Sequence, residues 1–92
     1  MNLREYYRMK TASITEADVR LVAACMTEYI GEENAVRIEQ LSGRVGMHER
    51  QVRDILETLV IVYGWPVCAH AGKAGRWLAT NEDDRWLVIG DL

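Results

Sequence analysis

The sequence predicts a small α+β domain, mainly helical, in which a three-helix core is followed by a C-terminal β-hairpin. Three apolar stripes with helical spacing lie between residues 15 and 63. Two short apolar runs, 67–70 and 77–80, then enclose a glycine-containing loop. Apolar stripes with helical spacing are typical of amphipathic helices, and short apolar runs around a glycine-containing loop are typical of hairpins. We assign residues 15–92 to this domain and 1–14 to an N-terminal arm.

Length and composition fit one globular domain. The chain has 92 residues, of which 49% are hydrophobic and 27% are charged, enough to fill one core and to cover it. The first residues lack a basic region followed by an apolar run, and no stretch reaches the length of a membrane helix. We therefore expect a cytoplasmic protein with no membrane partner.

The cysteines and histidines do not have the spacing of a metal site. Cys25 and Cys68 each stand in an apolar stretch, where a buried free thiol packs as a small hydrophobe. They form no CxxC pair, and His48 and His70 complete no zinc-ligand spacing. The sequence also lacks a glycine-rich phosphate loop and a nucleophile with a plausible base. We expect no metal, no cofactor and no enzymatic activity.

The first predicted helix begins near Thr15 and stops at Gly31. Thr15 has the character of an N-cap, with Asp18 three residues later as in a capping box, and a glycine favours a helix end. The buried stripe of this helix consists of Val19, Val22, Ala23, Met26, Tyr29 and Ile30. Residues 1–13 have no clean period, so an extended arm and a short helix on the core both fit them.

Two further helices are expected between residues 38 and 63, after a short strand at 35–36. The inner face of the second helix is marked by Ile38, Leu41 and Val45. Gly46 then interrupts the pattern. The stripe of the third helix consists of Val52, Ile55, Leu56, Leu59 and Tyr63. Gly64 and Pro66 end this helix, because proline cannot continue the hydrogen-bond ladder.

The spacing around Gly46 is that of a helix-turn-helix. Such a motif needs apolar anchors on both helices, a small residue where they cross and a glycine in the turn. These positions are filled by Leu41, Ser42, Val45, Gly46, Val52 and Ile55. A hairpin that follows the motif stands where a wing belongs. We therefore expect a winged helix-turn-helix, with the motif at about 38–63 and the wing at about 67–80.

In these segments the chain resembles small winged helix-turn-helix proteins of bacteria and their phages, and it is similar to the DNA-binding domain of the biotin ligase repressors. The resemblance covers IEQLSGRVGMHERQVRDILETL, YGWPVCAH and GKAGRWLAT, together about half of the chain. Trp77, two residues after Gly75, stands where this family often has an aromatic residue in the wing. The resemblance implies sequence-specific binding of duplex DNA, with the third helix in the major groove and the wing along a neighbouring groove. It implies no ligase activity.

The formal net charge of −3 is unfavourable for DNA binding, but the distribution of charge favours the motif. Residues 1–36 carry four basic and six acidic side chains, residues 37–76 carry six and four, and residues 77–92 carry one and four. Only the middle segment is net positive, and it contains both the helix-turn-helix and the hairpin.

The third helix and the hairpin supply the candidate DNA contacts. Arginine can bind guanine, and glutamine adenine, through two hydrogen bonds each, so the early residues of this helix suit base readout. The candidates for base contacts are His48, Arg50, Gln51 and Arg53. The candidates for phosphate contacts are Arg37, Arg44, Lys73 and Arg76.

A second interpretation of the same arginines is structural. Arg50 with Asp54 and Arg53 with Glu57 are each four residues apart, which fits ion pairs on a helix surface. Such pairs, together with the acidic balance of the chain, favour a winged-helix module that binds a protein partner without binding DNA. A phage-encoded protein that inhibits a host enzyme is an example of such a module. The leading hypothesis is a DNA-binding regulator of transcription or replication, of phage or mobile-element type. The alternative is a protein-binding module.

Two apolar residues are predicted to point away from the core. Leu21 on the first helix and Ile61 on the third lie opposite the buried stripes. A short chain buries a modest share of its surface, so a partner that covers such residues adds stability. We therefore expect a homodimer that uses Leu21 or Ile61. The tryptophans Trp65, Trp77 and Trp86 are expected to pack in the core or at its rim.

Overall fold

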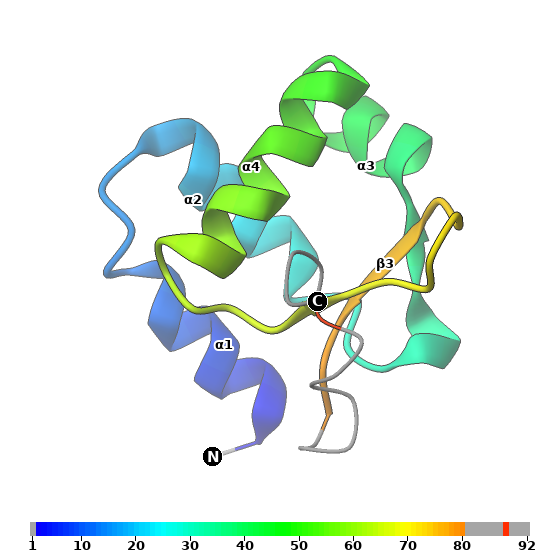
Figure 1. The fold of residues 1–92 in the computed structure, drawn as a ribbon. Coiled ribbons are helices and arrows are strands. Elements are labelled where there is room, and N and C mark those ends of the chain that lie inside the picture. Colours follow the sequence, from blue (N-terminus) through cyan, green and yellow to red (C-terminus); the bar gives the residue numbers. More distant parts are fainter. Residues whose placement is uncertain (1, 81–87, 89–92) are drawn as a thin grey trace.

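The computed structural model describes residues 2–80 and Val88, and it has a mainly helical α+β fold (Figure 1). Within this range the helices are α1 (Leu3–Thr11), α2 (Ala17–Met26), α3 (Ile38–Val45) and α4 (Glu49–Ile61). The strands are β1 (Val36–Arg37), β2 (Val67–Cys68) and β3 (Gly75–Leu78), and a 3-10 turn, η1 (Glu32–Asn34), precedes β1. Figure 1 shows α1 and α3 on opposite sides of the molecule, with α2 and α4 between them.

The three-stranded sheet joins the hairpin to the strand that precedes α3. β3 lies between β1 and β2 and is antiparallel to both. The register pairs are Val36 with Arg76, Arg37 with Gly75, Val67 with Leu78 and Cys68 with Trp77. The hairpin strands differ from the prediction: β2 begins at Val67 as expected but ends two residues early, and β3 both begins and ends two residues early. The first two residues of β3 are strand because they pair with β1, a partner that the hairpin pattern does not contain.

α2 is shorter than its apolar stripe predicts. Its N-cap is Glu16 rather than Thr15, and no side chain caps it; the Asp18 carboxylate instead accepts a hydrogen bond from the Val19 amide at 2.9 Å. The predicted capping box is therefore wrong. The helix ends at Met26 because the next residues turn toward the sheet, where the Leu78 amide donates to the carbonyl of Tyr29 at 2.8 Å.

The apolar stripes of α2, α3 and α4 meet in one core, as the sequence predicts. The residues predicted to join the motif helices to α2 are all buried: Leu41, Val52, Ile55 and Leu59. Trp65 and Trp77 are also buried, which confirms their assignment to the core, while Trp86 lies outside the described residues. Cys68 is buried and Cys25 is half-buried.

Residues 3–11 form a helix on the core rather than an extended arm. Tyr7 is buried, its ring lies 5.7 Å from that of Trp65, and its hydroxyl donates a hydrogen bond to the carbonyl of Ala79 at 2.8 Å. Ile14, in the link to α2, is fully buried. α1 therefore holds together the chain after α4 and the end of β3.

We expect Tyr7→Phe to lower the free energy of unfolding by roughly 1–3 kcal/mol, because the buried carbonyl of Ala79 then loses its hydrogen-bond donor. Urea denaturation followed by circular dichroism measures this change. Tyr6→Phe is the matched control, since Tyr6 is exposed on the same helix, and it should change the stability by less than about 0.5 kcal/mol. Equal stability of the two variants would contradict the expectation.

Candidate functional site

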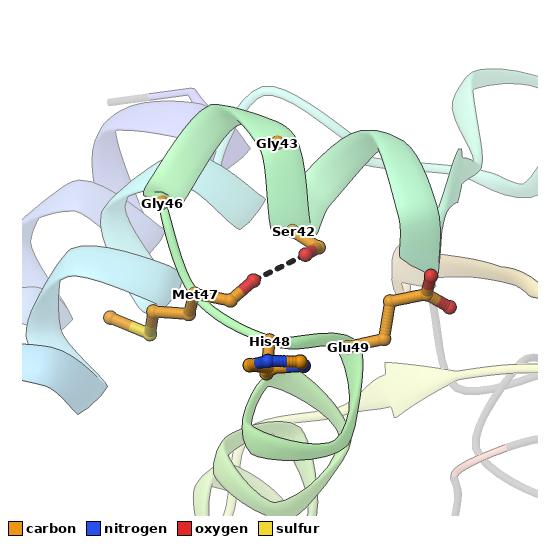
Figure 2. Close-up of a pocket in the computed structure, with 6 residues that line it drawn as sticks. All are labelled: Ser42, Gly43, Gly46, Met47, His48 and Glu49. Atoms are coloured by element: carbon orange, nitrogen blue, oxygen red, sulfur yellow. Dashed lines mark hydrogen bonds between the residues drawn. The ribbon is translucent and has the colours of Figure 1, made fainter.

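The turn between α3 and α4 has the conformation that its glycine predicts. Gly46 has a φ of +70°, in the left-handed region that favours glycine, and its amide donates to the Ser42 carbonyl at 2.9 Å. The Ser42 hydroxyl donates to the carbonyl of Met47, so this small side chain also fixes the chain as it enters α4 (Figure 2).

An open hollow of about 460 Å³ lies at this turn, lined by Ser42, Gly43, Gly46, Met47, His48 and Glu49 (Figure 2). The space beside Gly43 and Gly46 is open, because a Cβ atom on either residue would meet no atom within 4 Å. His48 is the N-cap of α4, but its side chain makes no capping hydrogen bond. The amides of the first turn of α4 therefore keep the partial positive charge of an uncapped helix start.

The four predicted base-contact residues are all exposed at the start of α4: His48, Arg50, Gln51 and Arg53. Neither ion pair of the alternative interpretation is present among the described residues. Arg53 Nη2 lies 3.8 Å from Glu49 Oε1, one turn before it, rather than beside Glu57. Arg50 forms no ion pair with any described residue. A contact of 3.8 Å between half-exposed groups contributes little, so both arginines remain accessible.

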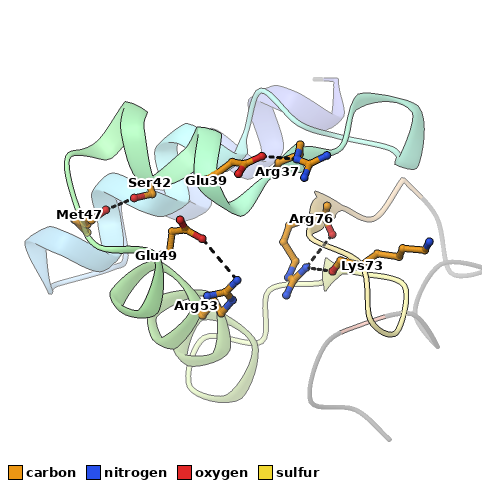
Figure 3. Close-up of polar contacts among 9 residues, drawn as sticks. Arg37, Glu39, Ser42, Met47, Glu49, Arg53, Lys73 and Arg76 are labelled. Carbon is orange, nitrogen blue, oxygen red and sulfur yellow. Dashed lines mark hydrogen bonds and ion pairs between the residues drawn. The ribbon is translucent and has the colours of Figure 1, made fainter.

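Arg76, in the predicted phosphate set, is held by backbone carbonyls of its own hairpin. Its Nη1 donates hydrogen bonds to the carbonyls of Lys73 at 2.8 Å and Gly75 at 3.1 Å. Burial and, to a lesser degree, the positive charge of Arg53 lower the pKa of Arg76. Figure 3 shows the side chains of Arg76 and Arg53 pointing toward each other, whereas the Lys73 ammonium points away from both.

Arg37 and Arg44, the other two predicted phosphate contacts, have acidic partners. Arg37 Nε lies 2.6 Å from Glu39 Oε1 (Figure 3). Arg44 Nη2 lies 2.9 Å from Glu28 Oε2, and Nη1 donates to the Tyr29 hydroxyl; these hydrogen bonds raise the pKa of Arg44. Arg44 therefore faces the segment after α2, and both arginines have less free positive charge than Arg53 and Arg76.

Sequence reasoning missed a contact that ties the hairpin to η1. His70 Nε2 lies 2.8 Å from Glu32 Oε2, and the His70 ring lies 5.3 Å from that of Trp77. Glu32 lies in η1 and His70 follows β2, and both of these elements lie against β3. No local pattern at either position predicts the contact.

Leu21 and Ile61 both point to solvent, as the helix phases predict: their exposed fractions are 49% and 67%. Val62, next to Ile61, is exposed to the same extent at 66%. The end of α4 therefore presents two adjacent apolar side chains.

Comparisons of the chain with protein-family models, curated proteins and solved structures gave no match. The fold itself defines a mainly helical α+β domain, whose element order is compatible with a winged helix. In the part of the chain that the structure describes, no helix has the length and apolar character needed to cross a membrane. The same residues contain no group of three or more metal-ligating side chains.

Proposed function

We propose that the protein is a winged helix-turn-helix protein that binds duplex DNA in a sequence-specific manner. The observation that carries this proposal is the exposed start of α4, where Arg50 and Gln51 lie next to the cationic pair Arg53 and Arg76. The element order and the sheet order β1-β3-β2 support the winged-helix part of the proposal.

The size and chemistry of α4 fit the major groove. A helix is about 10–12 Å wide with its side chains, and the major groove of B-DNA is about 12 Å wide. In the first two turns of the 13-residue helix α4, the side chains on the face opposite the core are exposed. Arg50 can donate two hydrogen bonds to a guanine, and Gln51 can exchange two with an adenine.

The backbone of the duplex has its own candidate partners. His48 and Glu49, at the start of α4 that no side chain caps, line the hollow beside Gly46, and helix starts of this kind bind phosphate groups. Lys73 and Arg76 on the hairpin supply cations for separate phosphates of the backbone. Such contacts fix the orientation of the helix and leave base selection to Arg50 and Gln51.

The role that the resemblance implies is a regulator of transcription or replication, of phage or mobile-element type. A domain of this size can act by occupying a short duplex sequence and excluding other proteins from it. Bacterial DNA lies in the cytoplasm, so the proposal includes a cytoplasmic location.

A second function, binding of a protein partner without DNA, is favoured by the acidic side chains on the same helix. Glu49, Asp54 and Glu57 are exposed on α4 and reduce the positive potential that attracts DNA. Ile61 and Val62 offer apolar area that a protein partner can bury.

Selection of bound sequences from a random pool of duplexes at low salt separates the two functions. We expect enrichment of one short sequence, because Arg50 and Gln51 discriminate between base pairs. Absence of any bound duplex would overturn the DNA proposal and leave the protein partner in its place.

We also propose a homodimer formed through Ile61 or Leu21. Ile61→Glu should then lower the dimer fraction in sedimentation velocity at high micromolar concentration, because a buried carboxylate opposes association. Leu21→Glu tests the other surface in the same way, and the surface that is not used should tolerate its substitution. A wild-type protein that sediments as a monomer at this concentration would contradict the dimer.

A further inference from the structure

Two arginines from different elements converge beside the start of α4. Arg53 lies on the second turn of α4 and Arg76 lies on β3, and their side chains point toward each other (Figure 3). Burial and, after it, the positive charge of Arg53 lower the pKa of Arg76. Arginine stays protonated in proteins, so both groups remain charged and repel each other.

Arg76 is fixed in this position before any ligand binds. Its Nη1 is held by the carbonyls of Lys73 and Gly75, and its backbone lies opposite Val36 in the centre of the sheet. A guanidinium that is already oriented loses little conformational freedom when it binds an anion. This fixation distinguishes Arg76 from Lys73, whose side chain is exposed and points away.

The charge of this pair is not balanced within the described part of the chain. Arg53 has one acidic partner there, Glu49, at the long distance of 3.8 Å. Arg76 has no acidic partner there, and its Nε is buried without a hydrogen bond. The pair therefore carries excess positive charge, which an anion with two acceptor oxygens can balance.

We propose that Arg53 and Arg76 together bind a single phosphate group of the DNA backbone. Each guanidinium donates to one of the two non-bridging oxygens, which places the phosphate between α4 and β3. The proposal rests on the DNA binding proposed above and changes the role of Arg53, from reading a base to positioning the helix. Arg50 and Gln51 remain for base readout.

Salt dependence distinguishes a shared phosphate from two separate ones. The slope of log K against log salt concentration falls by about 0.9 for each phosphate contact removed. We expect the double variant Arg53→Ala/Arg76→Ala to lose about 0.9 in slope. A loss of about 1.8 would mean two phosphates and overturn the proposal. Arg53→Ala/Lys73→Ala is the control pair, and its losses should add. Relaxed base preference in Arg53→Ala would also overturn the proposal.

Glu49 provides a second test, because it competes with the phosphate for Arg53. Glu49→Gln should raise the affinity for unrelated duplexes several-fold more than Glu57→Gln, which makes the same change of charge on the same helix without an ion pair to Arg53. The advantage of Glu49→Gln should disappear when Arg53 is alanine. Equal effects of the two substitutions would count against the site.

A measurement with inorganic phosphate separates failure of this site from failure of DNA binding. In the full chain, the Nε–H resonances of Arg53 and Arg76 should shift together during a phosphate titration, with one dissociation constant and with chloride at equal ionic strength as the reference. The shift at Arg53 should be lost in Arg76→Ala. If both resonances shift together but the protein binds no duplex, the shared anion site is supported and the proposed DNA binding is wrong. Duplex binding with no shifts, or with independent ones, would retain the function and reject the shared site.

Discussion

Leu59→Ala is expected to lower the free energy of unfolding by about 2–5 kcal/mol. Leu59 is fully buried on α4, the helix that packs against both α2 and α3. The loss combines the transfer energy of the removed methyl and methylene groups with the cost of the cavity that they leave.

Glu57→Ala is the matched control, since Glu57 lies two residues earlier on the same helix and is exposed. Its effect should stay within about 0.5 kcal/mol. A domain of this length has a stability on the order of 5–14 kcal/mol, so the loss in Leu59→Ala is a large fraction of the total. Urea denaturation of both variants measures the difference. Similar losses in the two would mean that the phase of α4 is wrong.

The helices of the motif were predictable because their signals are local. The stripe of α4 repeats within one turn of helix, so neighbouring residues alone fix which side faces the core. Gly46 interrupts two such stripes, and its left-handed conformation follows from the absence of a side chain. The same locality explains the exposure of Leu21 and Ile61, which lie opposite their stripes.

The features that the sequence did not predict depend on partners far along the chain. α2 ends at Met26 because the following residues bond to β3, and β3 begins at Gly75 because β1 pairs with it. The burial of Tyr7 depends in the same way on Ala79 and Trp65. Apolar spacing within any of these segments contains no information about the distant partner.

Within the candidate site, side-chain direction decided between two acidic neighbours. Glu49 and Glu57 are equally distant from Arg53 in sequence, and the sequence favoured Glu57 by spacing alone. Helical side chains lean toward the N-terminus of the helix, so Arg53 meets Glu49 instead. The approach of Arg53 to Arg76 was not predicted, because it depends on how the sheet lies against α4.

Arg50→Ala and Lys73→Ala are expected to fail in different ways. Loss of Arg50 should weaken the preferred duplex by about 1–3 kcal/mol and relax the preference at one base pair, because a bidentate contact to a base is removed. Loss of Lys73 should weaken all duplexes about equally and lower the salt slope by about 0.9, because a phosphate contact is removed. Fluorescence anisotropy with the selected duplex and with single-base variants, at several salt concentrations, measures both quantities.

The acidic residues of α4 make this test sharper. Asp54 and Glu57 are exposed on the helix that carries Arg50, and their charge opposes the approach of phosphate groups. Asp54→Asn/Glu57→Gln should therefore strengthen nonspecific binding while the far-ultraviolet circular dichroism and the unfolding midpoint stay unchanged. In this background Arg50→Ala should still relax the base preference, since the contact to the base does not depend on the overall charge. If neither the wild type nor the neutralised variant binds any duplex at low ionic strength, the start of α4 is not a DNA-binding surface. Its arginines and acidic residues then form a mixed-charge surface for a protein partner.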